Sequence, residues 1–81
     1  MQDVFIPTMR HKICLDTMSD VREFVKIVQD YDKHNIFITD GNRMRVNAKS
    51  VIGVLYSMEF DNIWIESDID IYSKISKFIK E

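Results

Sequence analysis

The side chain best placed to do chemistry in this sequence is the hydroxyl of Ser50, which stands where a strand pattern changes into a helix pattern. Asn47 is a good N-cap, so we expect Ala48, Lys49 and Ser50 to be the first three helical residues. The N–H groups of a first helical turn lack intrahelical partners and carry partial positive charge, which favours a bound anion. Ser50 is therefore a candidate phosphorylation site, although a first helical turn suits serine for structural reasons alone.

The remaining polar residues form no catalytic or metal-binding pattern. His11 and His34 have no partner at metal-ligand spacing, so we expect both to be surface residues. Cys14 lies in a strand pattern, where a cysteine is more often a small buried residue than a nucleophile. Four carboxylates stand near the starts of helices, where they complement the helix dipole: Asp16, Asp20, Asp68 and Asp70. We therefore expect no enzymatic activity, no cofactor and no metal.

Charge restricts the classes of partner. Eleven basic and thirteen acidic side chains give a net charge of −2, so no global field attracts nucleic acid or an anionic membrane. Arg43, Arg45 and Lys49 flank strands that contain aromatic residues, and a solvated basic edge is the default interpretation of this pattern. We therefore expect no direct contact with nucleic acid.

The 81 residues are expected to form a single domain, residues 1–81, of which residues 1–9 are either an edge strand or a loose N-terminal arm. One cysteine excludes an internal disulfide and fits a reducing cytosol. No apolar run approaches the roughly 20 residues of a membrane span, and the first residues lack the basic and apolar regions of a signal peptide. A cytoplasmic protein without membrane contact is expected.

The pattern of the first half of the chain predicts a strand followed by a helix. Residues 11–15 alternate, with Ile13 and Leu15 on one face. Residues 17–20 then offer two N-caps for an amphipathic helix. Its apolar residues recur at three- and four-residue spacing: Val21, Phe24, Val25, Val28 and Tyr31.

A β-hairpin and a second helix are expected next. Residues 36–39 and 43–46 are expected to pair as antiparallel strands across a turn at residues 40–41. In the helix that begins near Ala48, Ile52 lies off the apolar stripe and is a candidate for an exposed contact. The stripe itself consists of Val51, Val54, Leu55 and Met58.

The last strand and helix complete the fold prediction. Ile63 and Ile65 share one face of a strand and Trp64 lies on the other. Ser67 and Asp70 have the spacing of a capping box before a helix whose apolar residues are Ile71, Ile75, Phe78 and Ile79. The order β-α-β-β-α-β-α predicts an α+β fold, a two-layer open-faced sandwich with three helices on one face of a four-stranded antiparallel sheet.

Residues 46–55, Val-Asn-Ala-Lys-Ser-Val-Ile-Gly-Val-Leu, resemble the regulatory segment of HPr, the small phosphocarrier of the bacterial sugar phosphotransferase system. The element order agrees with that family's open-faced sandwich. The resemblance implies that Ser50 is phosphorylated by a dedicated ATP-dependent kinase, and that the phosphorylated form binds a transcriptional regulator in carbon catabolite repression. It also implies partner contacts by Asn47, Lys49, Val51, Ile52 and Leu55.

The family's other signature is missing. HPr proteins carry an active-site histidine followed by Ala-Arg-Pro-Ala at the start of the first helix, and the histidine ring accepts phosphate. Thr17 takes the histidine position here and Ser19 the arginine position, so the imidazole nucleophile and the phosphate-binding guanidinium are both absent. The resemblance therefore implies a diverged member without histidine phosphocarrier activity.

The expected function is regulation through protein contacts, with a serine kinase/phosphorylase, a transcriptional regulator or sugar-transport components as partners. Two alternatives stay open. One is a phosphocarrier with a displaced acceptor, such as His11 or Thr17. The other is a structural or interaction module that keeps only the fold, and burial of Trp64 and Phe60 in the core would favour it, because no recognition surface need then be invoked.

Overall fold

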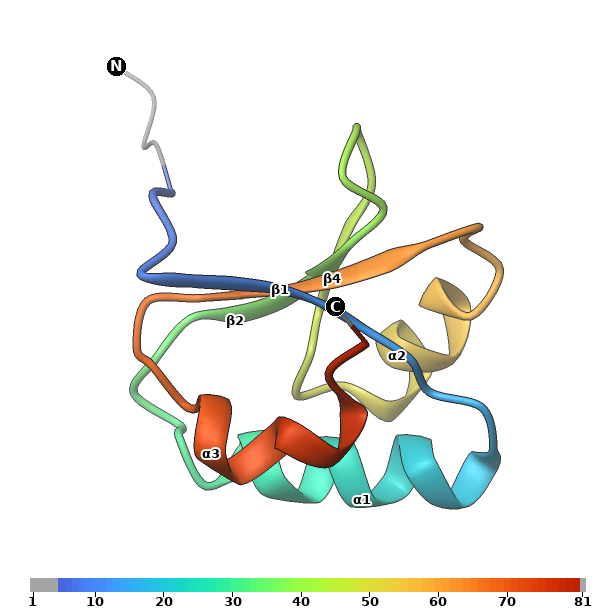
Figure 1. Cartoon of the computed structure of the whole chain (residues 1–81), viewed down its shortest axis with the longest axis horizontal. Helices are drawn as coiled ribbons and strands as arrows, with labels where there is room; N and C mark the ends of the chain where they lie inside the picture. Colours follow the sequence, from blue (N-terminus) through green and yellow to red (C-terminus); the bar gives the residue numbers. More distant parts are fainter. Residues whose placement is uncertain (1–4, 81) are drawn as a thin grey trace.

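Residues 5–80, the part of the chain that the computed structural model describes, form a four-stranded sheet and three helices. The elements are β1 (Met9–Ile13), α1 (Met18–Gln29), β2 (Ile36–Thr39), β3 (Arg45–Asn47), α2 (Val51–Ser57), β4 (Ile63–Ser67), α3 (Tyr72–Ile75) and the 3₁₀ turn η1 (Ser76–Phe78). The sheet is antiparallel with strand order β1-β4-β2-β3, and all the helices lie on one side of it (Figure 1). The predicted α+β open-faced sandwich is confirmed.

The core lies between the sheet and the helices. In β4, Ile63 and Ile65 point towards the helices and are buried, whereas Trp64 points to the opposite face and is half-buried. The rings of Phe24 in α1 and Phe78 in η1 meet edge to face with their centroids 5.7 Å apart. The other buried apolar residues are Met9, Ile13, Leu15, Val21, Val25, Val28, Ile36, Ile38, Ala48, Val54, Ile71 and Ile75. No helix within residues 5–80 covers the second face of the sheet.

The start of α1 agrees with the sequence prediction. Thr17 is the N-cap, and its Oγ1 accepts a hydrogen bond from the Asp20 N–H at 3.0 Å. The Asp20 carboxylate accepts in return from the N–H groups of Thr17 and Asp16. This reciprocal capping box satisfies backbone donors that the helix itself leaves without partners.

The first strand begins earlier than the sequence predicted. β1 spans Met9–Ile13 and not residues 11–15, because Met9 already pairs with Ser67 of β4. Ile13 and Leu15 are both buried, as predicted. Residues 5–8 form no strand, although the Thr8 N–H donates to the Ser67 carbonyl. Residues 1–4, the first part of the proposed N-terminal arm, lie outside the described residues.

The β2–β3 hairpin is confirmed with a shorter second strand. The Asp40 carboxylate accepts from the N–H groups of Asn42, Arg43 and Met44 at 2.8, 3.1 and 3.1 Å. Those N–H groups are used within the turn, so β3 begins at Arg45 and not at residue 43. Gly41 has φ +82°, a left-handed conformation that glycine adopts without strain.

The predicted capping box before the last helix is wrong. Ser67 belongs to β4, where it pairs with Met9 and Ile36, and its hydroxyl accepts from the Ile69 N–H. Asp70 accepts from the Tyr72 N–H, and α3 starts only at Tyr72. Sheet pairing therefore holds Ser67 too early in the chain for it to cap a helix. The predicted apolar residues nevertheless face the core: Ile71, Ile75 and Phe78 are buried, and Ile79 packs against them.

Candidate functional site

The segment that resembles the HPr regulatory region forms the turn between β3 and α2 and the helix itself. Ser50 is the N-cap of α2, and its Oγ accepts from the Gly53 N–H at 3.1 Å. A Cβ on Gly53 would lie 3.4 Å from the Ser50 Cβ and 3.2 Å from the Asn47 carbonyl oxygen. Glycine at this position therefore lets the serine side chain fold closely over the first turn.

The prediction that Asn47 caps this helix and that Ser50 is the third helical residue is wrong. Asn47 is the last residue of β3, and its side-chain oxygen accepts from the Lys49 N–H at 2.9 Å. The N–H of the buried residue Ala48 donates to the Ile36 carbonyl in β2. The bond from Lys49 to Asn47 is one that an N-cap side chain would also accept. The bond from Ala48 to β2 instead keeps the chain next to the sheet beyond Asn47, so the helix begins three residues later.

The side chains of Asn47 and Lys49, two of the expected partner-binding residues, hold the turn together. The Lys49 ammonium donates to the His34 carbonyl in the loop before β2. The Lys49 carbonyl accepts from the Gln29 side-chain amide at the end of α1. The turn that carries Ser50 is thereby attached to two other parts of the molecule.

The outer side of α2 exposes apolar side chains. Ile52, as expected, is exposed over 81% of its surface. The predicted stripe is only partly correct, because Val54 and Ser57 face the core while Leu55 and Met58 are exposed. Ser57 fits the interior because it is small and its hydroxyl donates to the Val54 carbonyl at 2.6 Å. We call Ile52, Leu55, Tyr56 and Met58 the α2 surface; Tyr56 and Met58 were not among the expected contact residues.

Thr17, which the resemblance places at the position of the active-site histidine of HPr proteins, has a structural role. Thr17 is exposed, but its hydroxyl oxygen is the N-cap acceptor of α1, and Ser19 is exposed in the first turn. A shallow hollow lined by Leu15, Ser57 and Met58 lies between the segment before α1 and the end of α2. Leu15 therefore lies near the C-terminal end of α2, whereas Ser50 lies at its N-terminal end.

The other titratable residues have local structural roles. His11 lies on the helix side of β1, with its ring centroid 4.8 Å from that of Tyr72. His34 Nδ1 lies 3.1 Å from an Asp68 carboxylate oxygen. The Cys14 thiol donates to the Asp16 carboxylate at 2.9 Å, and this hydrogen bond, with burial, raises the pKa of the thiol. Cys14 is therefore held in its thiol form, which is the poor nucleophile.

Residues 5–80 contain no group of three or more histidine, cysteine, aspartate or glutamate side chains able to hold a metal ion. None of the helices in this part of the chain has the length and apolar character needed to cross a membrane.

Comparison of the chain with protein-family models, curated proteins and solved structures found no match. The likeness to HPr proteins therefore depends on residues 46–55 and on the order of the elements around them.

Proposed function

We propose that this protein is an HPr-like regulator without histidine phosphocarrier activity that acts in the bacterial cytoplasm through protein contacts. The observation that carries the proposal is the exposure of Ile52, 81%, on a helix whose neighbouring residues Leu55 and Tyr56 are also exposed. Apolar side chains grouped on one side of a short helix are typical of a protein-binding surface. By resemblance, the positions of Ile52 and Leu55 match those of the partner-binding patch in HPr proteins.

In this proposal Ser50 is the regulatory position. A phosphate on its oxygen would stand at the boundary between the β3–α2 turn and the α2 surface. Two negative charges there would change how a partner with basic residues binds that surface. The unmodified hydroxyl oxygen of Ser50 already stabilises the helix start, because it accepts a hydrogen bond from the Gly53 N–H. Phosphorylation would therefore alter an existing contact and need not build a new one.

The kinase assay tests the role of Ser50. The protein is incubated with the serine kinase of the HPr family and ATP, and label incorporation is measured for the natural sequence, S50A, S50D and S73A. S50D retains an N-cap acceptor, so loss of label in S50D as well as S50A reports the missing hydroxyl and not a damaged helix. Ser73, an exposed serine of α3, serves as the matched control. Equal labelling of S50D and the natural sequence would rule out the regulatory site.

A binding titration tests the α2 surface. The Ser50-phosphorylated protein is titrated with the family's catabolite-repression regulator, in the natural form and as I52S and I6S. Ile6 is exposed over 78% of its surface outside α2, so it matches Ile52 in residue type and exposure. We expect I52S to weaken binding about tenfold or more and I6S to leave it unchanged, because central apolar contacts dominate interface energetics. Equal effects of the two substitutions, or no binding by any form, would contradict the proposed regulatory function. The remaining interpretation would be a structural module that keeps only the fold.

The absence of phosphocarrier activity is tested separately. Incubation with the first enzyme of the phosphotransferase system and phosphoenolpyruvate should yield no acid-labile phosphohistidine. Label on His11 or His34 would contradict the proposal and support a displaced phospho-acceptor.

A further inference from the structure

The face of the sheet opposite the helices carries an ordered set of basic and aromatic side chains. Residues that pair across neighbouring strands point to the same side, so the register defines two rows on this face. In the strand order β1-β4-β2-β3, the first row is Lys12, Trp64, Thr39 and Arg45. The second row is Arg10, Glu66, Phe37 and Asn47. Cations thus stand on the two outer strands and aromatic rings on the two inner strands.

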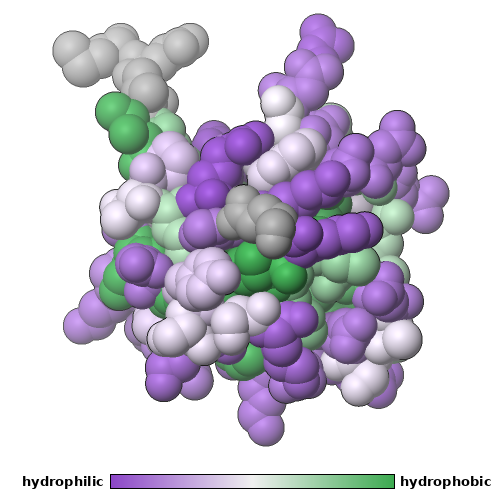
Figure 2. All heavy atoms as spheres, viewed as in Figure 1, coloured by the Kyte–Doolittle hydropathy of each residue, from purple (hydrophilic) through white to green (hydrophobic). Residues whose placement is uncertain are grey.

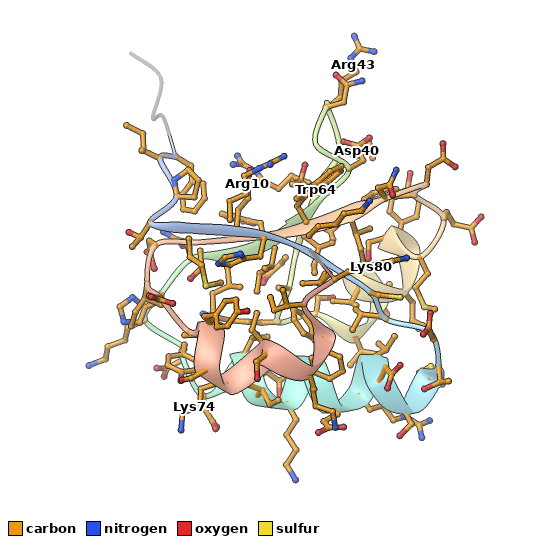
Figure 3. The ribbon with its side chains drawn as sticks, viewed as in Figure 1. Arg10, Asp40, Arg43, Trp64, Lys74 and Lys80 are labelled. Carbon is orange, nitrogen blue, oxygen red and sulfur yellow. The ribbon has the colours of Figure 1, made fainter. Side chains whose placement is uncertain are left out.

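Direct contacts connect the cations to the rings. The Arg10 guanidinium lies 5.0 Å from the centre of the Trp64 ring, and the Lys12 ammonium lies 5.9 Å from it. The Arg45 guanidinium lies 4.6 Å from the centre of the Phe37 ring. In Figure 3, Arg10 and Trp64 lie above the sheet and Lys74 lies on the helix side. Hydrophilic side chains also predominate along the top of the molecule in Figure 2.

A hollow under the β2–β3 hairpin adds a third arginine. It is lined by Arg10, Arg43 and Arg45, together with the single carboxylate of Glu66. Glu66 is already paired with Arg10, whose Nε lies 3.0 Å from its Oε2. The nearby Asp40 carboxylate accepts hydrogen bonds from three backbone N–H groups of the turn. The hollow therefore holds an excess of positive charge in a protein whose net charge is −2.

We propose that this open face binds single-stranded nucleic acid. Guanidinium groups suit phosphate because their N–H donors match its oxygen atoms, and aromatic rings suit the flat faces of unpaired bases. An acidic peptide would use the arginines but not the rings, so the central position of Trp64 and Phe37 favours the nucleic acid. This site lies on the opposite side of the sheet from the helices and does not depend on the function proposed for α2.

Binding requires the arginines to exchange partners. A base that stacks on Trp64 displaces the Arg10 guanidinium, which stays charged and becomes available to a phosphate. Base stacking on an aromatic ring generally stabilises more than one exposed cation–π contact does, and an exposed ion pair such as Arg10–Glu66 contributes little. Base stacking on Trp64 is therefore expected to outweigh the loss of these two contacts.

The sequence alone favoured a solvated basic edge and no contact with nucleic acid. Arg43 and Arg45 stand far along the chain from Arg10 and Lys12. Only the pairing of β1 with β4, and of β4 with β2, brings the two basic groups to one face.

The test uses Trp64, the one tryptophan of the chain, as its own probe. The natural protein is titrated at low salt with a thymidine oligomer of about 12 nucleotides, a length within the usual site sizes. We expect the oligomer to quench Trp64 emission, and we expect binding, followed by anisotropy of a labelled strand, to weaken steeply with added salt. A uridine oligomer of equal length distinguishes DNA from RNA as the preferred strand.

Two matched double variants decide whether the face is responsible. R10Q/R45Q removes two charges from the open face, and K26Q/K74Q removes two exposed charges from the helices on the other side. We expect the first variant to weaken binding about tenfold or more and the second to change it by less than about twofold. Circular dichroism confirms that both variants fold. Absence of quenching, equal loss in both variants, or equal quenching by a polyglutamate peptide would each overturn the proposal.

Discussion

Asp40 shows how one carboxylate can determine the shape of a turn. Three backbone N–H groups donate to it, from Asn42, Arg43 and Met44. Hydrogen bonds to the ionised form, that from Asn42 first, lower the pKa of Asp40 below its ordinary value of 3.8. The turn is thus most stable while the carboxylate is charged.

This pKa shift predicts a pH-dependent stability. Because the pKa is lower in the folded state, the stabilisation by Asp40 is complete above the unfolded-state value and is lost as the pH falls below 3.8. Urea unfolding from pH 6 to pH 3 should therefore show a steeper loss of stability for the natural protein than for D40N. D32N, which changes an exposed aspartate in the turn before β2, should keep the natural slope. Parallel pH profiles for the natural protein and D40N would contradict this role.

The N-cap residues of the two longer helices show which helix starts can be predicted from the sequence. Thr17 and Asp20 were recognisable as helix-start residues because both partners of the capping box lie within four positions. Asn47 and Ser50 are equally good N-caps by residue type, and the choice between them depends on the Ala48 N–H bond to Ile36, twelve residues away. Local preference alone could not separate them.

Among the elements, the β2–β3 hairpin depends on Gly41 for two reasons. Its φ of +82° is unfavourable for residues with a side chain. A Cβ at Gly41 would also lie 2.9 Å from Cζ3 of Trp64, so the turn rests directly on the indole ring. The hairpin and the open face are therefore structurally coupled.

We expect G41A to destabilise the protein and to change the environment of Trp64. The left-handed conformation alone costs a residue with a Cβ about 1–2 kcal/mol, and the contact with the ring adds to this. Chemical unfolding measures the first effect, and the emission maximum of Trp64 reports the second. N42A, at the neighbouring turn position, should leave the emission maximum unchanged. If G41A matched N42A in both measurements, the turn would not constrain the ring.

The sequence predicted the presence of the helices and strands better than the residues at which they begin and end. The sequence patterns identified the four strands and the three α-helices, because apolar spacing follows directly from helix and strand geometry, but they did not identify the 3₁₀ turn η1 (Ser76–Phe78). The ends depend on pairing with distant strands, as at Ser67, which the ladder with β1 and β2 holds in the sheet. The exposure of Leu55 and Met58 likewise follows from how the short α2 rests on the sheet.

For the whole molecule, one architectural fact dominates: all the helices cover a single face of the sheet (Figure 1). The fold class was predictable, since three amphipathic helices and four short strands can bury their apolar faces together in two layers. The composition of the open face was not, since the strand order β1-β4-β2-β3 places residues from both ends of the chain side by side. Strand order depends on contacts that local patterns do not encode.

Because the core lies on only one side of the sheet, we expect Phe24 and Trp64 to contribute very differently to the stability of the protein. Phe24 is fully buried against Phe78, whereas Trp64 is half-buried on the open face. F24A should therefore lower the free energy of unfolding by about 3–5 kcal/mol, the usual cost of emptying a large core position. W64A should cost about 1 kcal/mol, as is typical of residues outside the core.

Urea unfolding followed by circular dichroism compares the two, since W64A lacks the fluorescent probe. A chain of this size has a total stability of about 4–12 kcal/mol, so F24A could leave too little folded protein to measure. F24L retains most of the apolar volume and should cost less than F24A while still exceeding W64A, because leucine cannot reproduce the edge-to-face contact with Phe78. A cost for W64A equal to that of F24A would mean that the open face packs as a second core. A small cost would leave Trp64 available for binding at little expense to the fold.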